Sequence, residues 1–181
     1  MITITASVLR KIAPKLLISR ADIMAHAIDD ALREFRIESL TDVEMFLAQA
    51  AHETGGFIYL REIWGPTKAQ EGYERRVDLG NAFAGDGKKF LGRGFFQVTG
   101  RGNYRRASIA LYKNTETLLD APELLEHPIP AARSAAWFWD YAQIMDLIPK
   151  GIEAVTKRIN GGLNGLDSRR EYLARVRTAF V

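Results

Sequence analysis

The feature that most constrains this chain is an amphipathic helix that has to stop at a glycine pair directly after a glutamate. Thr41 and Glu44 have the spacing of a capping box, in which each side chain satisfies a free backbone donor, so they predict the start of the helix. Glycine tolerates the left-handed backbone that ends many helices, and Gly55-Gly56 predicts the end. Between them, one stripe of a 3.6-residue period carries Val43, Phe46, Leu47, Ala50 and Thr54.

Glu53 lies on the apolar side of this predicted helix. It follows Ala50 by three residues and Phe46 by seven, so it projects towards the same stripe. Burial among apolar side chains disfavours a charged carboxylate and favours the protonated form. A protonated carboxyl group beside a cleft is what a general acid requires, so Glu53 is a catalytic candidate.

A second carboxylate, Glu62, follows nine residues after Glu53. On a straight helix the two would sit about 13.5 Å apart along the axis and half a turn out of phase. We therefore expect the chain to bend at Gly55-Gly56 and bring the two acids together. Two facing carboxylates, with Trp64 as a platform for a sugar ring, form the arrangement that glycoside hydrolysis uses.

A glycine-rich segment at residues 90–104 predicts another part of the site, because glycine at this density lets the backbone approach a ligand. Gln97, Thr99 and Asn103 in this segment offer neutral hydrogen-bonding groups that suit hydroxyls and acetamides. The segment lacks the spacing and the Lys-Ser/Thr ending of a phosphate loop.

The remaining pattern predicts a mainly α-helical chain. Apolar residues at helical spacing indicate helices at about residues 24–35, 131–145 and 152–159 and from about residue 167 onwards. Residues 66–89 lose this pattern, and such a long irregular stretch inside a compact domain is more often functional than incidental. We expect at most a small β-hairpin, in the 66–100 region.

Composition bounds the function without fixing it. At 181 residues and 47% hydrophobic, the chain predicts a single catalytic domain over residues 1–181. Without cysteine it suits a reducing compartment, and without a signal-peptide apolar region we expect it to be made in the cytoplasm. A net charge of +3 fits an ordinary surface or a polyanionic partner. No nucleic-acid-binding motif accompanies the basic residues, so we expect no nucleic-acid partner. We also expect a monomer.

Four motifs in order resemble a known family. They are His52-Glu53-Thr54-Gly55-Gly56, then Gly92-Arg93-Gly94-Phe95-Phe96-Gln97-Val98-Thr99 with Asn103-Tyr104, then Ala135-Ala136-Trp137-Phe138-Trp139, then Ile159-Asn160-Gly161-Gly162. From about residue 20 to about residue 175 the chain resembles glycoside hydrolase family 19, the chitinases and the related phage endolysins. The resemblance implies a lysozyme-like, two-lobed helical domain and an inverting mechanism.

The resemblance also implies roles for single residues. Glu53 matches the general acid, which protonates the glycosidic oxygen, and Glu62 matches the general base of the compact bacterial members, which activates water. Thr99 matches a Ser or Thr that helps to hold that water. We expect substrate contacts from His52, Trp64, Gln97, Asn103, Tyr104, Asn160 and Arg169, with Arg170 as the alternative to Arg169.

This chain departs from the plant members, which carry disulfides and a longer insertion between the two acids. Because their base lies farther from the acid along the chain, Glu74 is a second candidate for the base beside Glu62. An inverting enzyme holds its two carboxyl groups roughly 6.5–9.5 Å apart, which leaves room for water.

Several substrates and classes of protein stay open. Chitin and peptidoglycan both contain β-1,4-linked N-acetylglucosamine, so the motifs do not separate them. The compact, cysteine-free chain favours a peptidoglycan-degrading endolysin of a phage or prophage, which acts on the cell wall after release through a separate holin-like, membrane-permeabilising protein. A chitinase and a non-catalytic glycan-binding protein are the alternatives. A zinc site fails, because position 56 is glycine where a second histidine ligand is required, so we expect no metal and no cofactor.

Overall fold

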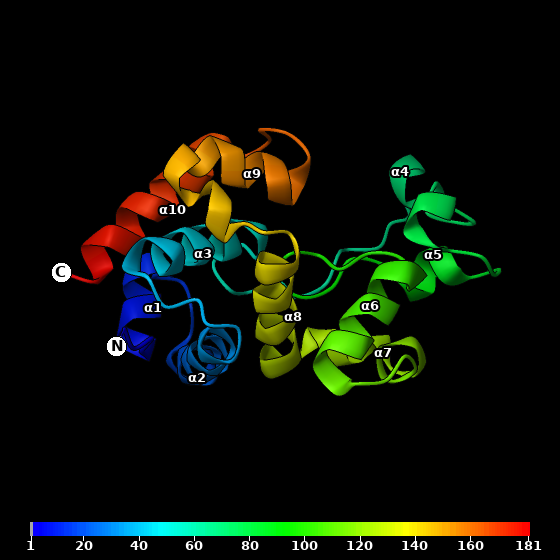
Figure 1. Ribbon diagram of the computed structural model, residues 1–181, viewed down its shortest axis with the longest axis horizontal. Helices are drawn as coiled ribbons and strands as arrows, with labels where there is room; N and C mark the ends of the chain where they lie inside the picture. The colour runs from blue at the N-terminus through cyan, green and yellow to red at the C-terminus, as the bar shows by residue number, and fades with distance from the viewer. Residues whose placement is uncertain (1) are drawn as a thin grey trace.

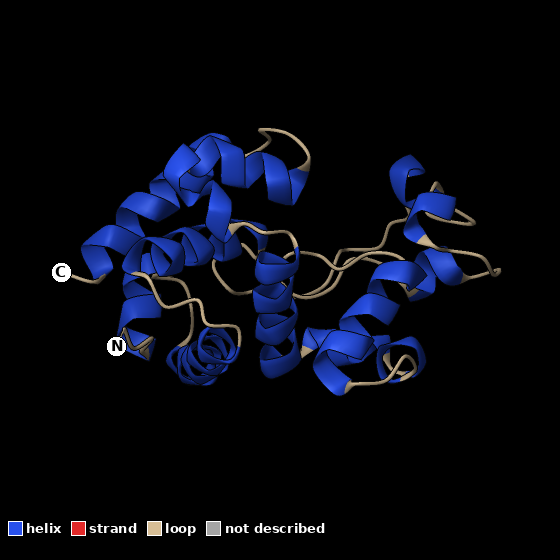
Figure 2. Cartoon of the chain, viewed as in Figure 1, coloured by secondary structure: helices blue, strands red, loops and turns tan. Residues whose placement is uncertain are grey.

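The computed structural model describes residues 2–181, and its regular secondary structure is almost wholly helical (Figures 1 and 2). The helices form two groups, a large lobe and a small lobe, joined by extended segments that cross between them (Figure 1). Within the described residues, β-pairing is limited to two isolated bridges, Arg61 with Arg93 and Arg93 with Val98. The expectation of a mainly α-helical, two-lobed chain is therefore confirmed.

The large lobe is built from both ends of the chain. Its main contacts are those of α3 with α10 and of α2 with α8, while α1 packs on α2 and α10. The elements of this lobe are α1 (Ala6–Ile12), α2 (Ile18–Glu34), α3 (Leu40–Glu53), α8 (Pro128–Tyr141), η3 (Met145–Lys150), α9 (Ile152–Asn160) and α10 (Leu166–Ala179).

The small lobe is formed by the middle of the chain. It consists of short elements around one longer helix, α6, which also contacts α8. Its elements are α4 (Lys68–Glu71), η1 (Val77–Leu79), α5 (Asp86–Lys89), α6 (Arg101–Tyr112), α7 (Thr117–Asp120) and η2 (Pro122–Glu126).

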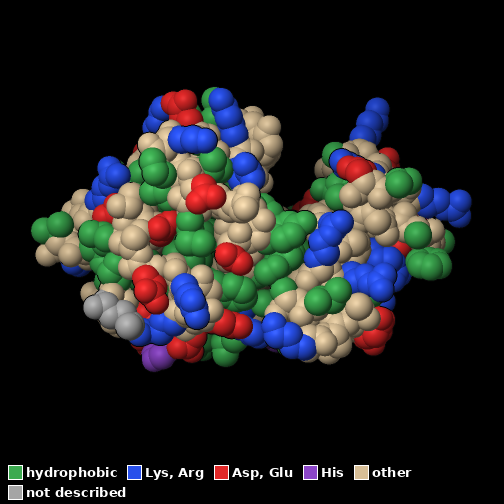
Figure 3. Space-filling model, in the orientation of Figure 1, with side chains coloured by type: hydrophobic (Ala, Val, Ile, Leu, Met, Phe, Trp, Pro, Cys, Tyr) green, Lys and Arg blue, Asp and Glu red, His purple; other side chains and the backbone are tan. Residues whose placement is uncertain are grey.

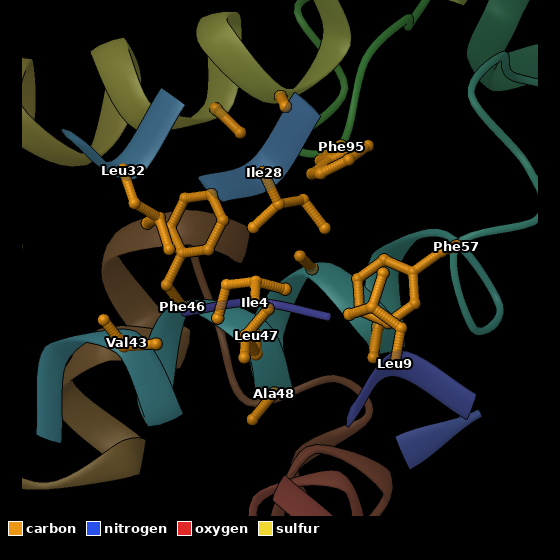
Figure 4. Close-up of a cluster of buried hydrophobic side chains, with 14 of the residues drawn as sticks. Ile4, Leu9, Ile28, Leu32, Val43, Phe46, Leu47, Ala48, Phe57 and Phe95 are labelled. Carbon is orange, nitrogen blue, oxygen red and sulfur yellow. The ribbon is translucent and has the colours of Figure 1, made fainter. Parts of the chain in front are cut away.

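Each lobe has its own hydrophobic core. In the large lobe the stripe of α3 supplies Phe46, which belongs to a buried cluster that includes side chains of other elements such as Ile28 and Phe95 (Figure 4). Its ring contacts Trp139 at 5.3 Å, edge to face, so one tryptophan of the aromatic helix is a core residue. The smaller core contains Phe90, Val98, Tyr104, Ala107, Leu111, Leu118, Leu119 and Leu125.

The start of α3 differs from the prediction. The N-cap is Ser39, whose hydroxyl accepts from the backbone N–H of Asp42 at 3.1 Å, and the helix begins at Leu40. The capping box of Thr41 and Glu44 is therefore wrong by two residues. Glu44 instead lies 3.2 Å from Arg177 of α10, a contact between helices that the local pattern does not contain.

The other differences concern short elements. The predicted helix at residues 24–35 begins earlier, at Ile18, and the stretch 66–89 contains α4, η1 and α5. The pattern did not predict α1, α6 or α7, and two of these are only seven and four residues long. Among residues 2–181, none of the helices is both long and apolar enough to cross a membrane.

Candidate active site

A left-handed turn directly after α3 separates the two acids. Gly55, Gly56 and Phe57 have φ values of 60°, 81° and 64°, so the chain bends where the glycine pair predicts. Arg20 of α2 fixes the turn, since its guanidinium donates to the carbonyls of Phe57 and Ile58 at 3.1 and 2.8 Å. The bend turns the chain out of the helix axis and sends it towards the small lobe.

Beyond the turn the chain runs as an extended segment beside residues 92–94. The N–H of Glu62 donates to Gly92 at 2.8 Å, and the N–H of Gly94 donates to Leu60 at 2.9 Å. A notch opens between α9 on the large lobe and α4 on the small lobe (Figure 3). Glu53 ends α3 of the large lobe, whereas Glu62 is held by residues of the small lobe.

Glu53 is fixed by an ion pair with a buried arginine. One terminal nitrogen of Arg169 lies 2.5 Å from Oε1 of Glu53. The other donates to the side chain of Gln49, which in turn donates to the hydroxyl of Thr156 at 3.1 Å. This chain of contacts links the acid to α10 and α9, the large-lobe side of the notch.

Two expectations about this acid are corrected. Arg169 is only 1% exposed and both terminal nitrogens bind groups inside the protein, so these contacts do not support the expected contact with substrate. The neighbouring Arg170 is exposed and pairs with Glu153 at 2.6 Å. The wall around Glu53 is also not purely apolar, because α10 brings a guanidinium to a carboxylate that is 19% exposed.

Glu62 is held by three hydrogen-bond donors. Its Oε1 accepts from the amide of Gln70 at 2.9 Å and from the hydroxyl of Tyr73 at 3.3 Å, and its Oε2 accepts from the N–H of Gly92 at 3.0 Å. Donors on both oxygens suit a carboxylate, which only accepts. Burial, and then the nearby negative charge of Glu62, raise the pKa of Tyr73 above its ordinary value of 10.0.

Gln70 is itself fixed by the loop around it. Gln70 is 4% exposed, and its side-chain oxygen accepts from the N–H groups of Gly65 and Thr67 at 3.1 and 2.8 Å. Its nitrogen donates to the carbonyl of Ile63 at 2.7 Å as well as to Glu62. The amide therefore has a single orientation, with a donor directed at the carboxylate.

Glu74, the second candidate for the base, serves a different purpose. Its two oxygens accept from the N–H groups of Gly85 and Gly87 at 2.8 and 3.0 Å. These amides lie at the start of α5, where backbone donors have no partner within the helix. The geometry thus favours Glu62 over Glu74 as a base.

Thr99 and Gln97 converge on Glu62 around a bare glycine. A methyl group added to Gly92 would lie 2.5 Å from Oε1 of Gln97, 3.2 Å from Oγ1 of Thr99 and 3.3 Å from Oε2 of Glu62. The Thr99 hydroxyl donates its hydrogen to the carbonyl of Gln97 at 2.9 Å, so the lone pairs of the Thr99 oxygen can accept from another donor. Both predicted residues therefore lie beside the predicted base.

Asn103 and Tyr104 are neighbours in sequence but differ in position. Asn103 is half-buried, with its amide donating to Thr99 at 2.8 Å and its oxygen accepting from Arg106. Tyr104 has no exposed surface, and its hydroxyl donates to Leu91 at 2.7 Å. The expectation that Tyr104 contacts substrate is wrong, because this side chain belongs to the core of the small lobe.

The remaining candidates lie at the edges of the site. His52 is half-buried beside Glu53, and Nδ1 lies 2.9 Å from the hydroxyl of Ser168. Burial lowers the pKa of His52, as does the charge of Arg169, while Glu53 opposes the shift. Trp64 is half-buried, with its ring 6.4 Å from that of Tyr73. Asn160 is exposed at the end of α9. Substrate contact by these three stays a prediction.

Sequence reasoning missed three residues of the site: Gln49, Gln70 and Tyr73. Gln49 could have been noticed as the polar residue of an otherwise apolar helix segment from Met45 to Ala51. Gln70 and Tyr73 lie in the stretch that the pattern described only as irregular. Within the described part of the chain, no cluster of three or more metal-ligating side chains occurs.

Known proteins resemble the chain over most of its length. The family described as Chitinase class I, glycoside hydrolase family 19, matches residues 36–160. A glycosyl hydrolase family 19 domain-containing protein of Haemophilus influenzae is 34% identical over 154 residues, which cover 69% of this chain and 73% of that protein. Endochitinase B of Zea mays is 30% identical over 134 residues, or 71% of this chain and 43% of that protein. The chain thus spans less than half the length of that plant relative.

The fold agrees with the sequence comparison. The crystal structure of chitinase C from Streptomyces griseus superposes with a TM-score of 0.74 at 21% identity, covering 97% of this chain and 76% of that one. The lysozyme-like helical fold is therefore confirmed. With this fold, a family match over most of the sequence and a relative at 34% identity, the chain belongs to glycoside hydrolase family 19.

Proposed function

We propose that this protein is an inverting hydrolase that cleaves β-1,4 bonds between the amino sugars of peptidoglycan during lysis of a bacterial host. One observation carries the proposal: two carboxylates are held by different partners, Glu53 by Arg169 and Glu62 by Gln70 and Tyr73. Different surroundings let one carboxyl group act as the general acid and the other as the general base, the two roles that inversion needs.

Glu53 acts as the general acid. Arg169 engages Oε1, which leaves Oε2 to carry the proton. As the bond between the anomeric carbon and the glycosidic oxygen breaks, this proton passes to that oxygen and the leaving sugar departs with a free hydroxyl. The carboxylate that remains is stabilised by the guanidinium already in contact with it, so the charge formed in the step meets a fixed partner.

Glu62 acts as the general base. It accepts a proton from a water whose oxygen bonds to the anomeric carbon on the face opposite the leaving group, which inverts that carbon. The lone pairs of the Thr99 hydroxyl can accept the second hydrogen of this water, since its own hydrogen is directed to Gln97. Exchange of protons with solvent then restores both acids.

Two observations favour peptidoglycan. The absence of cysteine suits a protein made in a reducing compartment, and the net charge of +3 suits an anionic wall. Chitin is the second candidate, because the relatives include endochitinase B and chitinase C. The proposal also includes a separate membrane-permeabilising protein as the route to the wall. Cells that produce this protein alone should stay intact, and coexpression of such a partner should lyse them.

The decisive experiment compares two substrates and two proteins. Wild type and Glu53→Gln, which keeps the side-chain volume, are incubated with purified Gram-negative wall sacculi and with colloidal chitin. We expect wild type alone to solubilise sacculi, with little release from chitin, and proton NMR of the first products to show the inverted anomer. Equal solubilisation of sacculi by Glu53→Gln would refute the assignment of Glu53 as the general acid. Activity of wild type on chitin alone would show that the substrate is chitin and not peptidoglycan.

A further inference from the structure

Three adjoining hollows surround α1 on the large lobe. The first, of about 480 Å³, lies between the end of α1, the turn at Gly55 and α10, and is lined by Lys15 and Arg175. The second, of about 400 Å³, is lined by Lys11 and Arg175, and the third, of about 450 Å³, by Arg10 and Lys11. Neighbouring hollows share Arg175 and Lys11, so they lie side by side on the surface, and the three together are called here the basic groove.

All charged residues that line the basic groove are cations. They are Arg10, Lys11, Lys15 and Arg175, and all four are exposed. Among the described residues, only Arg175 has an ion-pair partner, Glu171 at 3.8 Å, and that carboxylate is 70% exposed. Such a distant, solvated pair neutralises little charge. Four cations on one concave surface create a positive potential that attracts an anionic ligand.

The walls of the groove are otherwise aliphatic. Ala13, Pro14 and Ile58 line the first hollow, and Tyr172 is the aromatic side chain there, with the guanidinium of Arg175 5.3 Å from its ring centre. A single-stranded nucleic acid needs several aromatic platforms for its bases. A short acidic peptide instead matches small aliphatic contacts interspersed with separate cations.

We propose that the basic groove binds the acidic peptide stems that peptidoglycan carries on its glycan strands, an inference that rests on peptidoglycan being the substrate. The first hollow is lined by Gly55 and Gly56, which follow Glu53 by two and three residues. The groove therefore starts at the turn that ends the catalytic helix. Chitin has no peptide, so this groove would distinguish the two polymers.

The dimensions suit this ligand. An extended peptide of four residues spans roughly 13–14 Å. The seven residues of α1 are about 10 Å long, so one stem extends along the whole helix. Its carboxylates would then meet Arg175 and Lys15 near one end of the groove, and Lys11 and Arg10 further along.

The test uses the double variant Lys11→Gln/Arg175→Gln, because each of the three hollows is lined by at least one of these two residues. Its matched control is Lys113→Gln/Lys150→Gln, which removes two charges from exposed positions outside the groove and the catalytic cluster. Rates are measured on intact sacculi and on sacculi from which an amidase has removed the peptides. Binding of a soluble stem tetrapeptide is followed by amide chemical shifts.

We expect the groove variant to cleave intact sacculi about tenfold more slowly than the control, since two surface ion pairs are lost. Both should cleave the stripped glycan equally, and only the control should bind the tetrapeptide. Equal rates on intact sacculi would overturn the inference while leaving the proposed function in place. If wild type binds the tetrapeptide through these residues but cleaves only chitin, the groove stands and the proposed substrate fails. Binding of oligonucleotides or anionic vesicles without the tetrapeptide would overturn the identification of the ligand.

Discussion

The guanidinium of Arg169 lies 2.5 Å from the carboxylate of Glu53 while being only 1% exposed. Its other terminal nitrogen donates to Gln49, so a single planar group holds the acid and the helix that carries it. The orientation of Glu53 therefore depends on α10, an element at the far end of the chain. Removal of the guanidinium would leave an acid without its partner and an amide without its donor.

The first prediction concerns Arg169→Met. We expect a loss of about 3 kcal/mol in the free energy of unfolding, the lower end for a buried pair because Glu53 is 19% exposed. The kcat should fall at least about 100-fold, as for other losses of electrostatic stabilisation in the transition state. Arg169→Lys should recover only part of the lost stability and of the lost kcat, since an ammonium is a point charge that does not reproduce the rigid, forked geometry of a guanidinium. Denaturant unfolding and initial rates measure both.

The control for this prediction is the adjacent Arg170→Met. Arg170 pairs with Glu153 on the surface, so its loss should change the free energy of unfolding by less than about 1 kcal/mol. A kcat of Arg169→Met within twofold of wild type would contradict the positioning role.

The second prediction separates the two candidates for the base. Glu62→Gln should lose about 1,000-fold in kcat with the fold retained, because a general base contributes on the order of 10²–10⁴. Glu74→Gln should keep the kcat but lose about 1–2 kcal/mol of stability, since it weakens the contacts with the N–H groups of Gly85 and Gly87. The reverse pattern of kcat values would move the base to Glu74.

The third prediction concerns the residue that orients Glu62. Gln70→Leu removes the donor 2.9 Å from Oε1 and leaves the N–H groups of Gly65 and Thr67 without an acceptor. We expect the kcat to fall about tenfold or more with a smaller change in KM, because substrate binding elsewhere is unaffected. Gln70→Glu should be worse than Gln70→Leu, since it places a second carboxylate against Glu62. A Gln70→Glu variant with wild-type kcat would show that the contact is irrelevant.

The fourth prediction tests the space around Gly92. In Gly92→Ala the new methyl group meets Oε1 of Gln97 at 2.5 Å, and Thr99 and Glu62 at little more than 3 Å. These side chains have to move, so we expect the kcat to fall about 100-fold, as small displacements at catalytic groups do. Gly162→Ala is the matched control, because its methyl group meets no atom within 4 Å. Similar kcat values for the two variants would argue against a catalytic cluster at Gly92.

The large helices could be predicted because their signal is local. Val43, Phe46 and Ala50 are all buried on one side of α3, as the 3.6-residue period requires. The first residue of the helix was harder to predict, since Ser39 and Thr41 are both good N-cap residues. In the structure Ser39 is the N-cap, and Glu44, the expected partner of Thr41, pairs with Arg177 of another helix. Local pattern thus predicts which segments are helical better than where each helix begins.

The site was predictable only where its residues lie in motifs. Glu53, Glu62 and Thr99 are found in the expected surroundings of turn and glycine-rich segment, but their partners come from elsewhere. Arg169 is 116 residues from Glu53. Its spacing to Leu173 and Val176 places it on the inward face of α10, but the pattern does not show that its partner there is Glu53. Tyr104 was misassigned for the same reason, because sequence adjacency to Asn103 does not reveal that its side chain points into a core.

The last prediction concerns pH and His52. Burial and Arg169 lower the pKa of this half-buried histidine, while in the unfolded chain it takes up a proton near pH 6.5. Below that pH the unfolded chain binds more protons than the folded one, so stability is present above about pH 6.5 and is lost as the pH falls through the folded pKa. His52→Gln should remove this loss, and its melting temperature should fall less than that of wild type between pH 7.5 and pH 5.5, by about 1–2 °C. His26→Gln, at an exposed histidine of α2, should keep the wild-type fall. Identical falls for His52→Gln and wild type would show that His52 stays neutral, or stays charged, in folded and unfolded chains alike.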